Sequence, residues 1–478
     1  MASRPTVDTS AGLIRGNDYW RLFAVLLGIV ATSALLLFEI DANPSLLAVL
    51  PPAISLLAVA IVSRQKQGSW LAPGAFFALV WSGFVWLPLL VAGELEVSPW
   101  AVWWIVGCTV AVSLGAQVGA SAGNRANRNH FKRGVQLSFR APSPEALIVV
   151  CSIIGAVAVL LLLRTKGLGF SVFLSSDTLN QVERDFSVDR YLNGVAEPLS
   201  ERLLRISIYF AALLSGLVLA TRPFGRRWLI AFFPLFPAAG FVAVLTTKTS
   251  LLYTVVLIAS SYLAFRLALA NPGEQVVTRS WRLLTVAVLA ALVPLFVFIQ
   301  VGRYGYSPGN PSQVDEVLSI LRLHAVGHLA AFSDWFAHGG WASPNLTFGT
   351  QTFAGVFDAT GLKTRPAGVY AENVYLAPGV YSNVYTIFRG LIEDFTAMGA
   401  LMILLTGGFA AGLAFARVQQ RRIGSVPVLV AFFAITLWSF VVNLFIYNTI
   451  LAAWLLFAAY VFIAERRGRA RTASLAKL

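Results

Sequence analysis

Charged residues and cysteines are scarce in this sequence. Asp, Glu, Lys and Arg make up 12% of the 478 residues, whereas soluble domains carry about 25%. Hydrophobic residues reach 57%, which excludes an ordinary soluble domain. The only cysteines, Cys108 and Cys151, fall inside apolar runs, so they are not expected to form a disulfide and do not indicate a redox compartment.

Signatures of nucleotide and zinc chemistry are missing as well. The sequence has no P-loop, no GxGxxG motif and no CxxC motif. ATP-driven chemistry and soluble-cofactor chemistry therefore have no support in the sequence. Neither a cofactor nor a metal ion is expected.

Long apolar runs predict an all-α, polytopic membrane protein in which residues 1–478 form one membrane domain. Runs of ~17–25 apolar residues can cross a bilayer as helices. About twelve are present, and the last two are so close that a tight turn is expected around Asn443–Asn448. The predicted spans are 20–38, 45–62, 71–92, 101–121, 145–163, 204–221, 228–246, 251–270, 283–301, 398–416, 426–446 and 449–464.

The distribution of basic residues predicts the orientation. With a cytoplasmic N-terminus, the cytoplasmic segments hold 24 of the 36 Lys and Arg residues and have a net charge of +19, whereas the exterior segments have −5. Such an excess of cytoplasmic Lys and Arg is the rule for membrane proteins. We therefore expect a multi-pass protein of the bacterial plasma (inner) membrane with both termini in the cytoplasm. No nucleic-acid partner is expected, because the basic residues are dispersed over many segments.

Two long connections are expected on the exterior face, 164–205 and 302–397. The second lies between the ninth and tenth spans and faces the periplasm. It combines arginine, histidine and carboxylate side chains in one long connection, so it is the candidate active site. Within it, Asp315–His338 predicts an amphipathic helix at the membrane interface. Gly339–Pro378 predicts irregular chain, because it is rich in Gly, Pro, Asn and Thr. Asn383–Ala400 predicts a short helix that leads into the tenth span.

Exterior Arg and Lys residues are candidates for phosphate binding. Basic residues are disfavoured on this face, and Arg can bind phosphate through two hydrogen bonds. Arg303 directly follows a span, and Arg389 lies just before one. The further candidates are Lys248, Arg184, Arg190 and Arg365. Alternatively these residues anchor the protein at lipid headgroups or form ion pairs, as the position of Arg184 beside two acidic residues suggests.

The same connection offers candidates for a general base. Glu393 and Asp394 follow Arg389 by four and five residues, so Arg389 and Glu393 share a helix face. A carboxylate beside a phosphate-binding Arg could deprotonate a sugar hydroxyl, although a plain ion pair explains the spacing equally well. The other candidates are Asp334, His324 and His328. The two histidines have the i, i+4 spacing of a metal pair, but the sequence fixes no third ligand.

Two short motifs in this connection resemble a known family. Asn383-Val384-Tyr385-Thr386, followed by Glu393-Asp394-Phe395 and Gly399, resembles the N-x-Y-T and D-F-G motifs of Wzy-type O-antigen (oligosaccharide repeat-unit) polymerases. Asn345–Gly349, with Thr352-Phe353 and Gly355, is similar to the Gly- and Phe-rich segment upstream of these motifs in the family. Thr396 stands where the family has the Gly of D-F-G. The many spans and the long late exterior connection are also similar.

The resemblance implies an inverting, metal-independent glycosyltransferase that polymerises undecaprenyl-pyrophosphate-linked repeat units on the exterior face. Arg303 and Arg389 would bind the pyrophosphates. Candidate glycan contacts are Tyr304, Trp335, Asn383 and Tyr385. The implied partners are the lipid-linked donor and acceptor and membrane lipids, with a chain-length regulator as a further candidate.

Two alternatives stay open. An O-antigen ligase-like transferase would differ only in its acceptor. A 12-span transporter or flippase of lipid-linked sugars should place charged groups in mid-span and contain discontinuous helices. Here the spans are nearly free of charge, although several prolines could interrupt helices.

Overall fold

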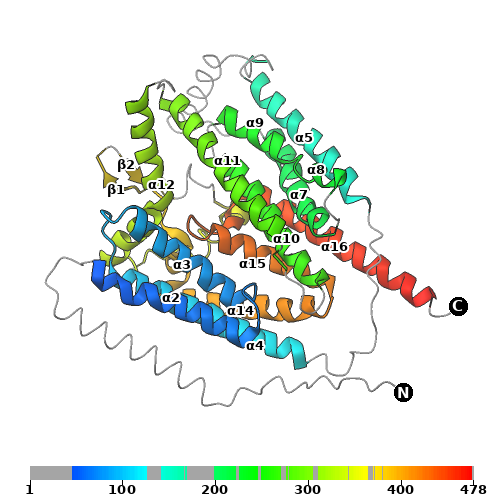
Figure 1. Cartoon of the computed structure of the whole chain (residues 1–478), viewed down its shortest axis with the longest axis horizontal. Coiled ribbons are helices and arrows are strands. Elements are labelled where there is room, and N and C mark those ends of the chain that lie inside the picture. Colours follow the sequence, from blue (N-terminus) through cyan, green and yellow to red (C-terminus); the bar gives the residue numbers. More distant parts are fainter. Residues whose placement is uncertain are drawn as a thin grey trace.

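The described part of the chain is a bundle of helices with one small β-hairpin at its edge (Figure 1). The computed structural model describes residues 46–125, 142–165, 167–169, 199–221, 225–245, 249–270, 276–277, 279–304, 310–342, 344–363, 370, 372–378 and 380–475. In its first half the helices are α2 (Leu46–Gln67), α3 (Pro73–Val91), α4 (Pro99–Arg125), α5 (Pro144–Arg164), α7 (Leu199–Thr221), α8 (Arg226–Ile230), α9 (Leu235–Leu245) and α10 (Thr249–Leu269). The second half contains α11 (Arg279–Tyr304), α12 (Pro311–Ala337), α13 (Ala354–Ala359), β1 (Val374–Ala377), β2 (Val380–Ser382), α14 (Thr386–Gln419), η2 (Ile423–Ser425), α15 (Val426–Trp438), η3 (Leu444–Ile446) and α16 (Asn448–Leu475).

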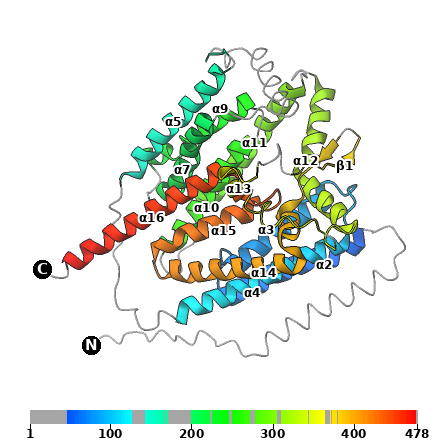
Figure 2. The ribbon, with the colours of Figure 1, turned by 180° about the vertical axis from the view of Figure 1, so that it is seen from behind.

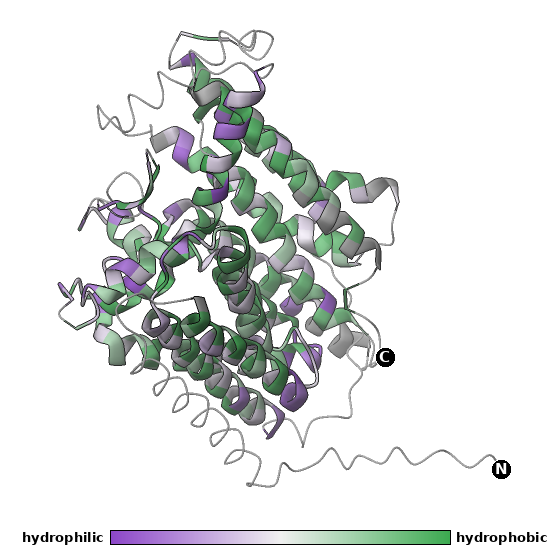
Figure 3. Ribbon diagram, turned by 60° about the vertical axis from the view of Figure 1, so that its left-hand side comes forward, coloured by the Kyte–Doolittle hydropathy of each residue, from purple (hydrophilic) through white to green (hydrophobic). Residues whose placement is uncertain are grey.

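Nine helical segments of the described chain are long and apolar enough to cross a membrane. Each coincides with a predicted span. Two further predicted spans correspond to shorter apolar helices, Ala290–Val301 and Ile423–Trp438, and the run at 20–38 lies outside the described residues. Most of the helices consist largely of hydrophobic residues, drawn in green in Figure 3. These helices indicate a multi-pass membrane protein, and the total of twelve spans stays a prediction.

Two predicted spans are interrupted. The run at 228–246 consists of α8 and α9, separated by Ala231–Pro234, because Pro234 has no backbone N–H to continue the helix. The run at 426–446 is helical only to Trp438. There the carbonyl of Ser439 accepts a hydrogen bond from Ile387 N at 2.8 Å, and the chain turns through η3. The turn expected around Asn443–Asn448 is thus present.

The segment predicted as a long loop, 302–397, is largely structured. The expected amphipathic helix is α12, which starts four residues earlier than predicted because Asn310 caps Ser312 N at 3.2 Å and Pro311 occupies the first turn. The prediction of irregular chain through Pro378 is wrong, since α13 and β1 lie within it. β1 pairs with β2 in antiparallel fashion, so the described chain is not strictly all-α.

α14 consists of two helical parts that meet at Thr396. The residue has φ 65° and ψ 171°, a conformation that glycine adopts far more easily. Its hydroxyl accepts a hydrogen bond from Gly399 N at 3.4 Å and so caps the second part. The first part matches the predicted short helix before the tenth span.

Glycines bring the backbones of α4 and α14 into direct contact. A Cβ atom at Gly115 or Gly119 of α4 would lie 2.0 Å from a carbonyl oxygen of α14, and one at Gly412 of α14 would lie 2.0 Å from Ala116 O. Small residues at this spacing allow membrane helices to approach closely. The sequence from Gly119 to Gly123 fits GxSxG, the pattern around the nucleophilic serine of α/β-hydrolases. In those enzymes the serine lies at a strand-to-helix turn, whereas here the pattern lies inside a continuous helix.

A cluster of aromatic and aliphatic side chains joins α12 and α14 to α3 and α4. Figure 2 shows these helices from behind. Phe388 of α14 lies 4.5 Å from Trp81 and 6.0 Å from Phe332 between ring centroids. All three side chains are at most 1% exposed. The neighbouring residue, Arg389, is therefore held on a fixed turn of helix.

Gly408 and Gly407 provide a test of the α4–α14 contact. A Cβ at Gly408 would meet Val112 O at 2.3 Å, whereas one at Gly407 meets nothing within 4 Å. Gly408→Ala should therefore cost about 1–3 kcal/mol and lower the melting temperature of the detergent-purified protein. Gly407→Ala should leave that temperature unchanged or raise it. Equal melting temperatures for the two variants would contradict the described contact.

Candidate active site

Arg389 is the centre of a buried polar cluster near the start of α14. Its side chain is 5% exposed. Nε donates to Glu393 Oε1 and Nη2 donates to Glu372 Oε2, each at 2.6 Å. The third nitrogen, Nη1, is buried and has no hydrogen-bond partner among the described residues. The guanidinium thus keeps unused donor capacity.

Three aromatic rings surround this guanidinium and form what we call the aromatic cage, Tyr370, Tyr385 and Trp335. The Arg389 Cζ atom lies 4.1 Å from the ring centroid of Tyr385, 4.3 Å from that of Tyr370 and 5.3 Å from that of Trp335. Such contacts favour a cation with a reduced water shell. Burial raises the pKa of the Tyr370 and Tyr385 hydroxyls, so both stay protonated.

Asp394 connects α14 to the preceding irregular segment. Its buried carboxylate accepts hydrogen bonds from the Thr347 hydroxyl, from Gln351 N at 3.0 Å and from Thr352 N at 2.5 Å. The carbonyl of Glu393 adds a bond from Thr347 N at 2.9 Å. The two motifs that stand some 40 residues apart in the sequence therefore meet at this carboxylate, which positions the loop 347–352.

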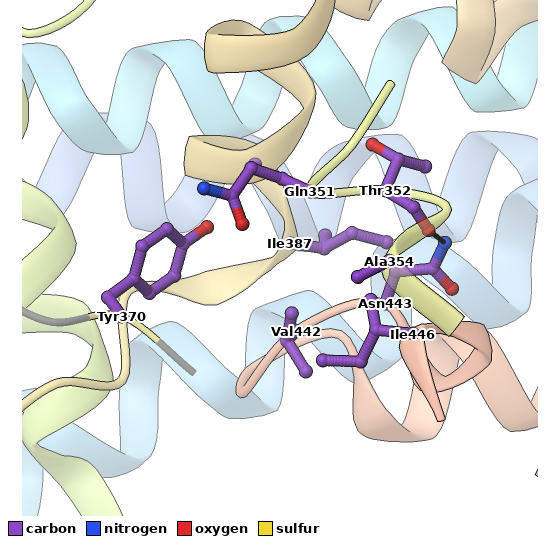
Figure 4. A pocket seen from close by; sticks show the side chains of 9 residues that line it. Gln351, Thr352, Ala354, Tyr370, Ile387, Val442, Asn443 and Ile446 are labelled. Atoms are coloured by element: carbon purple, nitrogen blue, oxygen red, sulfur yellow. Dashed lines mark hydrogen bonds between the residues drawn. The ribbon is translucent and has the colours of Figure 1, made fainter. Parts of the chain in front are cut away.

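A narrow cavity lies beside the loop, with room for about one water molecule. Figure 4 shows the Tyr370 hydroxyl and the Gln351 amide on one side and Asn443, from the turn before α16, on the other. Asn443 Nδ2 donates to Thr352 O at 3.0 Å. The Tyr370 hydroxyl is buried and has no hydrogen-bond partner within the described part of the chain. The cavity is thus polar at the end nearest the aromatic cage.

The histidine candidates do not face one space. His328 is 2% exposed, and its Nε2 lies 3.1 Å from Phe84 O, as a donated hydrogen bond requires. His324 is exposed, and its Nδ1 lies 2.8 Å from Ile320 O. Asp334 lies on the exposed side of α12, 3.4 Å from His338 Nδ1. Among the described residues, no three His, Cys, Asp or Glu side chains group as metal ligands.

The structure brings together five of the candidate residues, namely Arg389, Glu393, Tyr385, Trp335 and Asn383. Asn383 belongs to this group because its Nδ2 donates to Tyr370 O at 3.2 Å. Arg303 and Tyr304 are the last residues of α11, and their side chains lie outside the described part. Lys248, Arg184, Arg190 and Arg365 lie outside the described residues altogether.

Sequence reasoning missed Tyr370 and Glu372. Both belong to the segment predicted as irregular, and neither has a sequence neighbour that indicates a role. The paired strands place this segment beside α14. The contacts of Tyr370 and Glu372 with Arg389 therefore depend on the hairpin and could not be predicted from the local sequence.

Asp394→Asn tests the role of the carboxylate in holding the loop. An amide cannot accept all three hydrogen bonds, so local opening of the loop should become easier by about 1–3 kcal/mol. Faster hydrogen–deuterium exchange is expected at the amides of Gln351 and Thr352, with unchanged exchange in α4. Asp358→Asn is the control, because it makes the same change of carboxylate to amide at a residue that contacts Arg202 and Asn448 instead of the loop 347–352. Unchanged exchange at both amides would show that Asp394 does not hold the loop.

His328 makes stability depend on pH. Burial lowers its pKa from 6.5 to about 4, so between these values the unfolded chain binds a proton that the folded one does not. Folding stability should fall by up to about 3 kcal/mol as the pH decreases from 6.5 to 4. His328→Gln should flatten this part of the melting-temperature profile. A variant profile as steep as that of the parent would assign the pH dependence to other groups.

Comparisons with known proteins identify no relative. No protein-family profile matches the chain, and neither the curated proteins nor the solved structures contain a match.

Proposed function

We propose that this chain is an inverting glycosyltransferase that polymerises undecaprenyl-pyrophosphate-linked oligosaccharide repeat units on the exterior face of the bacterial plasma membrane. The observation that carries the proposal is the Arg389 cluster. It unites a buried cation with a free donor, two carboxylates and aromatic rings. It also lies on the segment that resembles the polymerase motifs.

The orientation is part of the proposal. α4 and α14 run side by side in the same direction, since Gly115 contacts Leu405 and Gly123 contacts Ala416. Arg125 and Arg417 therefore lie together at the helix ends opposite to Arg389. Placing these basic ends in the cytoplasm, as the positive-inside rule favours, puts the Arg389 cluster on the exterior face.

Each group in the cluster has a role in the proposed reaction. The acceptor hydroxyl attacks the anomeric carbon of the donor glycan, the bond to the pyrophosphate breaks, and the pyrophosphate leaves with the electron pair. Arg389 stabilises the charge that develops on this leaving group. A carboxylate takes the proton of the acceptor hydroxyl. The half-buried ring of Trp335 offers apolar surface to a sugar, whereas the ring of Tyr385 is buried against Arg389 and supports the cation.

Asp394 has a supporting role in this scheme. It is 1% exposed and already accepts three hydrogen bonds. Both of its oxygens are thus already engaged in positioning the loop 347–352. Its removal should therefore impair the reaction through the loop rather than through proton transfer.

The test is incubation of the purified protein, in nanodiscs, with a lipid-linked repeat unit. We expect a ladder of products that differ by one repeat. A single transfer to another acceptor would instead indicate a ligase. Transport of the lipid-linked sugar across a vesicle membrane without any covalent product would indicate a flippase.

Arg389→Lys should reduce turnover at least about 10-fold, because Lys keeps the charge but not the planar pair of donors. The melting temperature should show that the variant is folded. Arg322→Lys is the matched control, since Arg322 pairs with Glu94 at 2.5 Å on the exposed side of α12. A product ladder that is normal in Arg389→Lys would remove Arg389 from the proposed mechanism.

A further inference from the structure

The two carboxylates bound to Arg389 differ sharply in exposure. The Glu393 side chain is 12% exposed and belongs to the same helix, four residues on. The Glu372 side chain is 70% exposed and comes from the segment that leads into β1. Both make a 2.6 Å contact with the guanidinium. Glu393 is therefore a fixed partner, whereas Glu372 reaches the guanidinium from the solvent side.

The charge of this trio opposes the binding of an anion. One guanidinium and two carboxylates sum to −1, and two like charges close together repel each other when partly buried. A phosphate group can bind Arg389 with its full affinity only if one carboxylate leaves. Exposed ion pairs contribute little and exchange readily with water, so Glu372 is the carboxylate that can leave.

The guanidinium can donate more hydrogen bonds to a phosphate than it donates to Glu372. Glu372 accepts from Nη2 only, and Nη1 is buried without a hydrogen-bond partner in the described chain. These two nitrogens form the end of the planar fork, which a phosphate group can bind with two oxygens. The aromatic cage holds the fork in place from the sides. A phosphate group that replaces Glu372 would thus gain a donor that the carboxylate does not use.

We propose that Glu372 is the resident anion of a phosphate-binding site, and that a phosphate group of the lipid-linked pyrophosphate displaces it from Arg389. The identity of this ligand rests on the proposed function. The site itself rests on the exposure difference, the net charge and the unused Nη1. Displacement moves the Glu372 carboxylate into solvent and leaves Glu393 as the internal partner of the cation.

The experiment measures the binding of inorganic pyrophosphate to the purified full chain in nanodiscs by titration calorimetry. Glu372→Gln removes one negative charge and weakens the competitor, so it should lower the Kd by at least about 10-fold. Glu372→Ala should show the same gain, and melting temperatures verify that both variants are folded. Glu94→Gln is the matched control, because it removes the carboxylate from the exposed Arg322 pair. Its Kd should equal that of the parent.

The double variant Glu372→Gln with Arg389→Lys should lose the gain, because the fork is then absent. Unchanged or weaker pyrophosphate binding in both Glu372 variants would overturn the proposal. So would a gain that persists without the fork, or no measurable binding by any variant.

These outcomes are separate from those of the polymerase test. A product ladder together with unchanged affinity in the Glu372 variants would overturn the resident-anion role and leave the polymerase proposal intact. Tighter pyrophosphate binding without any ladder would support the anion site and overturn the polymerase.

Discussion

The backbone contact between α4 and α14 is the constraint on which the polar cluster depends. Gly115 and Gly119 on one helix, with Gly408 and Gly412 on the other, allow the two backbones to touch without an intervening side chain at these positions. At this distance the neighbouring helices have a single register, since a shift by one residue would place a larger side chain against a carbonyl. α14 therefore has one position relative to α4, and Arg389 inherits that position.

Each buried charge near this contact is compensated by neighbouring groups. Arg389 and Asp394 are buried because each is surrounded by groups that compensate its charge, rings and carboxylates in one case and hydrogen-bond donors in the other. Unpaired charges in such positions would be costly. The groups that carry spare capacity, Arg389 Nη1 and the Tyr370 hydroxyl, lie where the hairpin segment meets α14. The polar atoms without a partner in the described chain thus lie on the side of the cluster that faces this segment.

Features that depend on local sequence were predictable. Apolar length predicted α2, α3, α4, α5, α7 and α10, although not the break between α8 and α9, and amphipathic spacing predicted α12. The four-residue spacing gave the Arg389–Glu393 pair. Features that depend on distant segments were not. His328 is buried because Phe84 and Phe440 come from other parts of the chain, which its spacing from His324 does not encode. The contact between Glu372 and Arg389 likewise requires the hairpin, whose short strands have only a weak sequence pattern.

The break at Thr396 divides α14 into two helical parts that pack against different partners. Packing fixes both parts, because Phe388 of the first lies within the aromatic cluster and Gly408 and Gly412 of the second contact α4. A strained backbone conformation persists only where the surrounding structure determines it. The positive φ of Thr396 is therefore maintained by the packing on its two sides, and loss of either contact would release the strain at this residue.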